Sequence, residues 1–375
     1  MKTLYFHIGS PKTGTTSIQN FCTDHREILE GKGLCYPIMP FVYEHKSKRR
    51  NGLFLTSRYV KDGVRDQEQE KENFHRGLSI IEQKFDTVDT VLISDEGAYS
   101  MFFRRKLYKT NGKMLAQWAK DHQIQLKIII YLRSQAEYAM SWYNQLIKHS
   151  VSEKLSSLTW EEYLKNYKRY VTLDYYKCLN ILSDIFGKEN IIVKRFDRAF
   201  FKNGSLVDDF MDIFGIEIDD AFPADSSKSE QNHGITENAC AIKRVINTID
   251  GIQHEEKQRF EQVLRSCSSS SREASRYSLM SDEEAEKFME RYQTDNQKIV
   301  DEYIKDGLPL FQKRKHKEKW TQFNTDYMDE RVRFLCLSNM EANRRIDQLE
   351  RMLKQQETKR TVDRIKNMFG KYSAK

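Results

Sequence analysis

Four short apolar runs along the chain predict buried β-strands. They are Leu4–Ile8, Thr90–Ser94, Leu126–Leu132 and Ile191–Lys194. The run Leu126–Leu132 is nearly continuous in apolar residues, as expected for a strand of a parallel sheet, which is buried on both faces. Stretches with apolar residues at helical spacing lie between these runs. The alternation predicts an α/β fold of three layers, in which helices flank a mostly parallel central sheet.

The predicted helices alternate with these strands along the chain. They cover Thr16–Gly31, Phe74–Lys84, Lys113–His122, Gln135–Lys148, Thr159–Phe186 in one or two pieces, and Leu206–Phe214. Gly31–Arg65 holds turn residues, aromatics and the basic run Lys46–Arg50, and a long irregular segment of this kind commonly lines a site. We also expect polar breaks at Ser226–Gly234 and Ser266–Ser275.

The C-terminal part carries a repeat that is typical of a coiled coil. Its positions follow one another at alternating steps of four and three residues. They are Met328, Val332, Leu335, Asn339, Ala342, Ile346, Leu349 and Leu353. Asn339 is a polar seam position of the kind that fixes register, and the seam leaves self-association open. A single amphipathic helix packed on the protein's own core fits equally well. We expect one domain over residues 1–310 and a helical extension over residues 311–375.

The positive charge of the chain is concentrated in this extension. The net charge is +7, whereas residues 313–375 alone hold 17 Lys and Arg against 9 Asp and Glu, a balance of +8. The part that precedes them is therefore close to neutral, and we expect it to bind no nucleic acid. The basic tail, including its last turn Ile365–Lys371, can contact an acidic surface such as the inner face of a membrane.

Composition narrows the class of protein further. A chain of 375 residues with 39% hydrophobic residues can form one large domain with an extension. It has no window of eighteen apolar residues and no signal-peptide pattern before its first strand. Six scattered cysteines without a CxxC pair indicate free thiols and argue against structural zinc. We expect a cytoplasmic protein without a metal.

The segment after the first strand has the composition of a phosphate-binding turn. Gly9–Thr16 links the strand Leu4–Ile8 to a predicted helix. Unpaired amides at a helix N-terminus and the positive end of the helix dipole attract an anion. Glycines let the backbone approach that anion, while threonine hydroxyls and a lysine add donors and charge. The predicted anion-binding residues are Ser10, Pro11, Lys12, Thr13, Gly14, Thr15 and Thr16.

The position of the lysine distinguishes this turn from the ATP and GTP loop, which reads Gly-x4-Gly-Lys-Ser/Thr. Gly9 and Gly14 have that spacing, but residue 15 is threonine and Lys12 precedes Gly14. A lysine inside the turn faces the terminal group being transferred and its bridging oxygen. The segment Pro11–Thr16 resembles the 5′-phosphosulfate loop of sulfotransferases that use 3′-phosphoadenosine 5′-phosphosulfate (PAPS). This resemblance implies that the predicted three-layer fold is P-loop-like.

A second segment supports the same resemblance. The strand Leu126–Leu132 ends at Arg133, and the predicted helix Gln135–Lys148 follows. Ser141 lies eight residues after Arg133, about 12 Å along a helix axis, a distance that an arginine side chain partly closes. This pair resembles the element by which sulfotransferases bind the 3′-phosphate of the nucleotide. The resemblance implies that Arg133 supplies a bidentate charge and Ser141 a hydroxyl donor.

The resemblance also implies a reaction, the in-line transfer of a sulfuryl group from PAPS to a hydroxyl. Lys12 would stabilise the leaving group, and no metal is needed because Lys12, threonines and loop amides can hold the charge of the nucleotide product. Cytosolic small-molecule sulfotransferases close the 3′-phosphate site with a late Arg-Lys-Gly element, which this sequence lacks. The chain is therefore more similar to the bacterial and Golgi-type carbohydrate branch, which implies a saccharide or glycolipid acceptor.

The candidate catalytic bases follow from the sheet edge and from the resemblance. Asp95 and Glu96 come directly after the strand Thr90–Ser94, at the edge where the loop and Arg133 also lie. In the glycan-modifying sulfotransferases that this chain resembles, a glutamate near the site commonly takes the proton of the acceptor, and Glu96 matches that position. Asp95 suits a cap or a structural carboxylate. His45 is the second candidate base, since histidine has a suitable pKa.

Two other functions stay open. Val91–Glu96 resembles the acid-terminated strand that holds Mg²⁺ in P-loop kinases and NTPases that use Mg-ATP, although the position of Lys12 argues against that class. A non-catalytic scaffold, whose coiled-coil tail recruits partners and whose loop merely binds an anion, is the other alternative. Retention of both Lys12 and Arg133 favours an enzyme.

Overall fold

The computed structural model describes residues 1–10, 12–44, 46–149, 153–222, 235–270, 277–313, 316–323 and 325–372. The chain divides into two compact units. The first comprises Met1–Gln145, Thr159–Asn232 and Met280–His316, and the second comprises Leu146–Leu158, His233–Leu279 and Lys317–Lys375. The predicted boundary between residues 310 and 311 stays a prediction.

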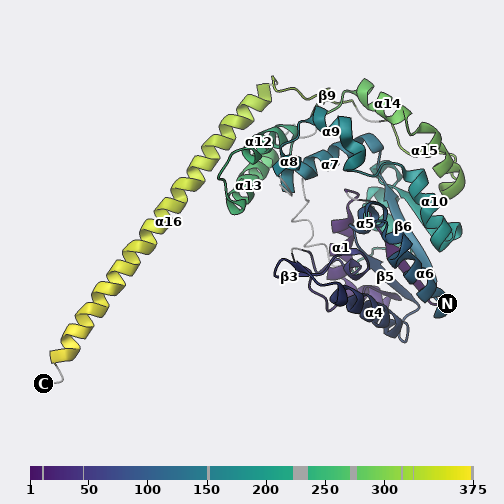
Figure 1. Cartoon of the computed structure of the whole chain (residues 1–375), viewed down its shortest axis with the longest axis horizontal. Helices are drawn as coiled ribbons and strands as arrows, with labels where there is room; N and C mark the ends of the chain where they lie inside the picture. Colours follow the sequence, from purple (N-terminus) through teal and green to yellow (C-terminus); the bar gives the residue numbers. More distant parts are fainter. Residues whose placement is uncertain are drawn as a thin grey trace. The chain divides into compact units, whose positions relative to one another are not determined.

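The first unit is built on a five-stranded parallel sheet (Figure 1). Its strands, in spatial order, are β2 (Leu34–Cys35), β5 (Thr90–Ser94), β1 (Thr3–His7), β6 (Gln125–Leu132) and β7 (Ile191–Arg195). All four neighbouring pairs run parallel. The predicted parallel sheet is confirmed, and the four predicted strands agree with the structure to within one residue at each end. The edge strand β2 is too short to produce an apolar run and was missed.

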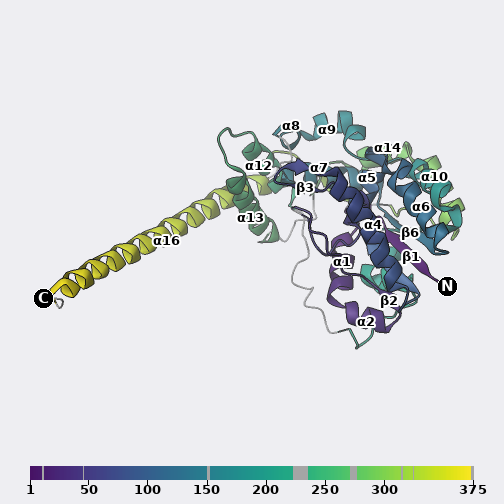
Figure 2. The same cartoon turned by 60° about the horizontal axis from the view of Figure 1, so that its bottom comes forward.

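Helices cover both faces of the sheet (Figures 1 and 2). One face packs against α1 (Thr15–Asp24), α2 (Arg26–Gly31) and α11 (Leu206–Asp212). The other face packs against α5 (Ala98–Arg104), α6 (Asn111–Asp121) and α10 (Tyr175–Phe186). Successive strand residues point to opposite faces, so Tyr5 joins the first core, whereas Phe6 meets Phe102 of α5 edge-on at 6.1 Å.

Two predicted helices have different bounds in the structure. The prediction Thr16–Gly31 is wrong at His25, which separates α1 from α2 with its ring bonded to the Phe21 carbonyl at 3.0 Å. The prediction Phe74–Lys84 is too short, because α4 spans Gln67–Lys84 and is capped by Asp66. The first turns of α4 are polar on every side, so no apolar period marks them.

The remaining helices of the first unit surround this core or extend from it. They are α3 (Leu53–Thr56), α7 (Gln135–His149), which continues into the second unit, α9 (Trp160–Asn166), α14 (Asp282–Glu290) and α15 (Gln293–Ile299). A short hairpin pairs β3 (Val60–Lys61) with β4 (Val64–Arg65). The segment Met280–His316 is fastened to the sheet by Arg195 of β7, whose guanidinium binds Asp306 at 2.6 and 2.8 Å. Hydrogen bonding from Arg195 lowers the pKa of Asp306 to about 2.

The second unit contains α8 (Glu153–Ser156), α12 (Glu237–Asn247), α13 (His254–Ser270), a β8–β9 pair (Tyr277–Ser278 and Glu318–Lys319) and α16 (Thr325–Tyr372). The predicted break at Ser266–Ser275 is wrong as far as Ser270, because α13 runs through it. The predicted break at Ser226–Gly234 lies outside the described residues. α16 is one helix of 48 residues that includes the whole predicted coiled-coil repeat. Within the described part of the chain, no helix combines the length and the apolar character that a membrane crossing requires.

Candidate functional site: the loop between β1 and α1

The loop between β1 and α1 adopts an unusual backbone conformation. Gly9, Lys12 and Gly14 have φ angles of 46°, 70° and 68°. A lysine in the left-handed region is uncommon and persists only where its surroundings hold it. Here the Lys12 carbonyl accepts a hydrogen bond of 3.2 Å from Nη1 of Arg133. Two positions predicted to bind the same nucleotide are therefore in direct contact.

Two hydroxyl groups of the loop fix its shape. The Ser10 hydroxyl donates to the Tyr131 carbonyl of β6 at 2.6 Å, and the Thr13 hydroxyl donates to the Ser10 carbonyl at 2.6 Å. Both side chains are fully buried. Because a hydroxyl has one hydrogen, neither group can donate to an anion in this arrangement. The Thr13 hydroxyl is thus engaged within the loop, and for Thr15 and Thr16 the expected donor role stays a prediction.

Thr15, the first residue of α1, has unused hydrogen-bonding capacity. Its side chain is 2% exposed, and its Oγ1 has no hydrogen-bond partner among the described residues. In the same part of the chain the amides of Gly14, Thr15 and Thr16 donate no backbone hydrogen bond. A Cβ atom on Gly9 would lie 3.1 Å from Thr15 Oγ1, so only glycine leaves this space open. Unsatisfied donors at a helix N-terminus fit an anion, because such groups are costly when they stay unpaired.

Arg133 lies at the carboxyl end of β6, as predicted. Its Nε donates to Glu137 Oε2 at 3.0 Å, and its guanidinium lies over the ring of Phe196 at 5.7 Å. Glu137 was missed, although its position four residues after Arg133 on a helix is a recognisable signal for an ion pair. Ser141 is half-buried two turns into α7.

The adjacent carboxylates Asp95 and Glu96 have different environments. Asp95 is fully buried; its Oδ1 accepts from Arg50 Nε at 2.9 Å and from the Gly97 amide at 3.0 Å, and its Oδ2 accepts from the Thr56 hydroxyl. Both carboxylate oxygens of Asp95 are thus engaged in structure.

Glu96 remains accessible beside the loop. Its side chain is 38% exposed, and its Oε1 lies 3.6 Å from Nη1 of Arg50. Its Cα is the backbone atom that a Cβ on Gly9 would approach to 3.2 Å. Of the two carboxylates, Glu96 alone is therefore both next to the anion cradle and able to meet a substrate.

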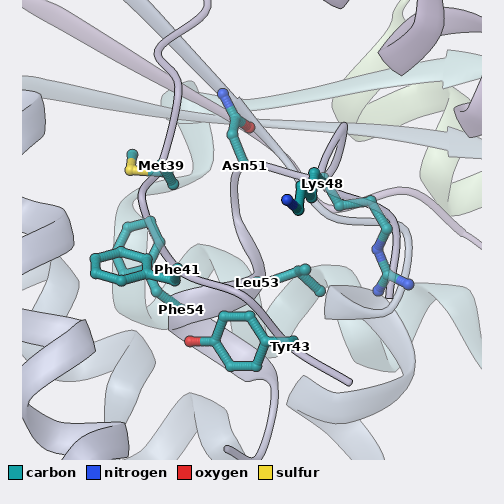
Figure 3. Close-up of a pocket in the computed structure, with 8 residues that line it drawn as sticks. Met39, Phe41, Tyr43, Lys48, Asn51, Leu53 and Phe54 are labelled. Atoms are coloured by element: carbon teal, nitrogen blue, oxygen red, sulfur yellow. The ribbon is translucent and has the colours of Figure 1, made fainter. Parts of the chain in front are cut away.

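A small pocket of about 10 Å³ opens beside Arg50 (Figure 3). It is lined by Met39, Phe41, Tyr43, Lys48, Arg50, Asn51, Leu53 and Phe54. Figure 3 shows Phe41 and Phe54 on one side and Lys48 on the other. Asn51 fastens the pocket to β5 by accepting from the Ser94 amide at 2.7 Å. The irregular segment Gly31–Arg65 thus lines a pocket next to the predicted site.

His45 and Pro11 lie outside the described residues. His7 is a fully buried core residue, whose Nδ1 lies 3.0 Å from the Ser94 hydroxyl, and burial lowers its pKa to about 3. Among the residues that the structure describes, no cluster of three or more His, Cys, Asp or Glu side chains could hold a metal ion.

Comparison with known proteins adds three findings. No protein-family model matches the chain. An uncharacterized protein of Archaeoglobus fulgidus is 28% identical over 179 residues, which cover 48% of this chain and 46% of that protein, so the chain spans about half the length of this curated relative. Among solved structures, a sulfotransferase from Alicyclobacillus acidocaldarius is similar with a TM-score of 0.33 and 18% identity, over 58% of this chain and 82% of that one. The case for a function rests on the residues of the site.

Proposed function

We propose that this protein is a PAPS-dependent sulfotransferase that transfers a sulfuryl group to a hydroxyl of a saccharide or glycolipid. The observation that carries the proposal is the cradle at the start of α1. It combines a left-handed Lys12 inside the turn with a buried Thr15 hydroxyl and three amides that have no hydrogen-bond partner among the residues that the structure describes. This is a site for a phosphate or sulfate group whose lysine approaches from within the turn.

On the donor side, each group has a distinct role in the proposal. The amides of Gly14–Thr16 and the Thr15 hydroxyl bind the 5′-phosphosulfate, and Lys12 neutralises its bridging oxygen. Arg133 and Ser141 bind the 3′-phosphate. Because Arg133 is paired with Glu137 at 3.0 Å, nucleotide binding would exchange part of that ion pair for a phosphate contact. The sequence PKTGTT and the contact between Arg133 and the loop support this assignment.

On the acceptor side, Glu96 takes the proton of the attacking hydroxyl. The acceptor oxygen forms a new bond to sulfur while the bond from sulfur to the phosphate oxygen breaks. The electron pair of the broken bond stays on that phosphate oxygen, where Lys12 holds the charge. Arg50, 3.6 Å from Glu96 Oε1, orients the carboxylate beside the loop.

The aromatic pocket next to Arg50 supports a saccharide or glycolipid acceptor. Phe41 is partly exposed and packs on the buried Phe54 with ring centroids 6.0 Å apart, so Phe41 offers an apolar surface at the mouth of the pocket for a sugar ring or an aliphatic chain. Lys48 on the same pocket can contact an anionic substituent. The pocket reaches Glu96 through Arg50, which takes part in both.

A Mg-ATP enzyme is less consistent with the same geometry. In that class the acid at the end of the second strand binds the Mg²⁺ ion, and Asp95 is the corresponding residue. Here Asp95 is buried and bound by Arg50, Thr56 and the Gly97 amide. A metal ion at Asp95 would have to displace a buried arginine.

Radiolabelled PAPS tests the proposal. Transfer of label to an extract of cell-envelope glycans is expected for the wild-type protein in the presence of EDTA. Lys12→Ala should abolish the transfer, and Lys32→Ala, which changes an exposed lysine outside the site, should leave it unchanged. Label transfer that survives in Lys12→Ala, or that requires Mg²⁺, would contradict the proposed mechanism.

A further inference from the structure

The coiled-coil repeat of α16 is exposed along its whole length. Its large apolar side chains at these positions are all more than half exposed: Met328 53%, Val332 57%, Leu335 65%, Ile346 52%, Leu349 58% and Leu353 59%. Asn339 and Ala342, the remaining positions, are exposed as well. We call these eight residues the seam. A continuous apolar stripe of this kind on a soluble helix marks an interaction surface.

Most of the seam lies away from the part of the second unit on which α16 packs; among its residues Ala342 lines a pocket that α16 shares with α13. That contact is made by Phe334, whose ring lies 5.9 Å from Phe260 of α13, and by Glu330, which accepts a hydrogen bond of 2.9 Å from Thr236. At about 100° of rotation per residue, Phe334 points roughly 130° away from the centre of the seam. The seam residues other than Ala342 are therefore open to a partner while α16 stays attached to α13.

We propose that the seam pairs with the seam of a second copy of this chain in a parallel two-stranded coiled coil. Val332, Asn339, Ile346 and Leu353 occupy the a positions, and Met328, Leu335, Ala342 and Leu349 the d positions. β-Branched residues at a and leucine at d favour two strands, and a single asparagine at a specifies register and pairing. In a parallel pair the two Asn339 side chains meet each other and satisfy their hydrogen bonds.

The charges that flank the seam select the parallel orientation. Positions g hold Arg331, Arg345 and Lys359, whereas positions e hold Glu350 and Glu357. A parallel pair places Arg345 of one copy next to Glu350 of the other, twice by symmetry. An antiparallel pair would instead place g beside g and e beside e, which brings arginine to arginine and glutamate to glutamate.

The length of the helix is sufficient for such a pair. The seam spans 26 residues, or about 39 Å of helix axis, and the whole of α16 is about 72 Å long. Isolated helices gain little from propensity alone, so burial of an apolar stripe is the usual source of stability for a long projecting helix. This proposal does not depend on the reaction at the loop.

The mass of the full-length protein in solution tests the proposal. Light scattering or sedimentation equilibrium at micromolar concentration should give twice the mass of one chain. The double variant Ile346→Lys/Leu349→Lys should halve that mass, because it places four like charges in one seam. The matched control Gln348→Lys/Gln355→Lys adds the same charge on the outer face of the same turns and should stay dimeric. A monomeric wild type, or a seam variant that remains a dimer, would overturn the proposal.

Crosslinking tests the orientation separately. In a Cys336→Ser background, which removes the exposed native thiol, Leu349→Cys should form a disulfide between two copies under mild oxidation, since d positions meet only in a parallel pair in register. Gln348→Cys should not. Failure of Leu349→Cys to crosslink in a protein that is dimeric by mass would exclude the parallel arrangement. Circular dichroism of each variant is the folding control, because a variant whose α16 unfolds would also be monomeric.

Discussion

At the scale of single residues, two residues adjacent in the sequence can have unrelated roles. Asp95 and Glu96 both follow β5, yet the first is buried among Arg50, Thr56 and Gly97 and the second is partly exposed beside Gly9. Both residues follow the end of β5 at Ser94, so the turn that begins there, and not strand alternation, directs their side chains. The resemblance and the position at the sheet edge identified Glu96, but its partner Arg50 was hidden in a basic run 46 residues earlier.

Substitution separates the two carboxylates. Glu96→Gln should lower kcat by about 10²- to 10⁴-fold, the usual contribution of a general base, while nucleotide affinity is retained. Asp95→Asn should instead lower the free energy of unfolding by about 3 kcal/mol, because it leaves the buried Arg50 without its charge partner. Initial rates and urea unfolding of both variants measure the difference. Normal turnover in Glu96→Gln would transfer the role of base to His45.

His7 gives a second prediction at this scale, one that concerns pH. Burial lowers the pKa of His7 to about 3, below its value of about 6.5 in the unfolded chain. Between these values the unfolded state binds the extra proton, so the free energy of unfolding should fall with decreasing pH, by at most about 1.4 kcal/mol per pH unit from this group. The contribution is absent above pH 6.5.

Urea unfolding at pH 7 and pH 5 measures this slope. His7→Asn should flatten it, because asparagine can keep the hydrogen bond to Ser94 without a titrating ring. The control His75→Asn, at an exposed position of α4, should keep the wild-type slope. Equal slopes in His7→Asn and the wild type would show that another group controls the acid sensitivity.

At the scale of elements, the sequence predicted the strands and helices that apolar periodicity and turn residues mark. Buried strands such as β5 and the start of α1 after Gly14 carry strong local signals. Residues 50–52, which contact the end of β5, carry no such local signal. Asn51 binds β5 through side-chain hydrogen bonds and not as part of a neighbouring strand. The short strand β2 and helix α5 were missed for a related reason, because tertiary contacts rather than local pattern define them.

The junction of β1 and α1 depends on Gly14 for two reasons, its φ of 68° and its packing. A Cβ atom on Gly14 would overlap Leu206 of α11 and approach Phe196 to 3.3 Å. Gly14→Ala should therefore lower the free energy of unfolding by about 1 kcal/mol for backbone strain and by about 1–3 kcal/mol more for overpacking.

Gly63→Ala is the matched control, because Gly63 has a φ of 77° and no atom within 4 Å of its added Cβ. It should show the strain alone. Thermal or urea unfolding of the two variants isolates the packing contribution. If both variants lose the same stability, α11 does not press on the loop as described.

At the scale of the whole molecule, the distribution of charge and apolar surface assigns different tasks to different parts. The parallel sheet gathers the loop, Arg133 and Glu96 at the carboxyl ends of β1, β6 and β5, as open α/β sheets do. The strands and this shared edge could be predicted from local sequence. The division into two units could not, because α12 and α13 join α16 through contacts between residues far apart in the chain.

Calorimetric titration with adenosine 3′,5′-bisphosphate in EDTA tests the central claim most directly, since this product carries both phosphates and needs no transfer step. We expect one bisphosphate site per chain. The affinity for the bisphosphate should be at least about tenfold weaker in Lys12→Ala and in Arg133→Ala, because each variant removes a charged hydrogen bond. Lys48→Ala, in the neighbouring pocket, should bind as the wild type does. Absence of binding by the folded wild-type protein, or tighter binding of Mg-ATP than of the bisphosphate, would contradict that claim.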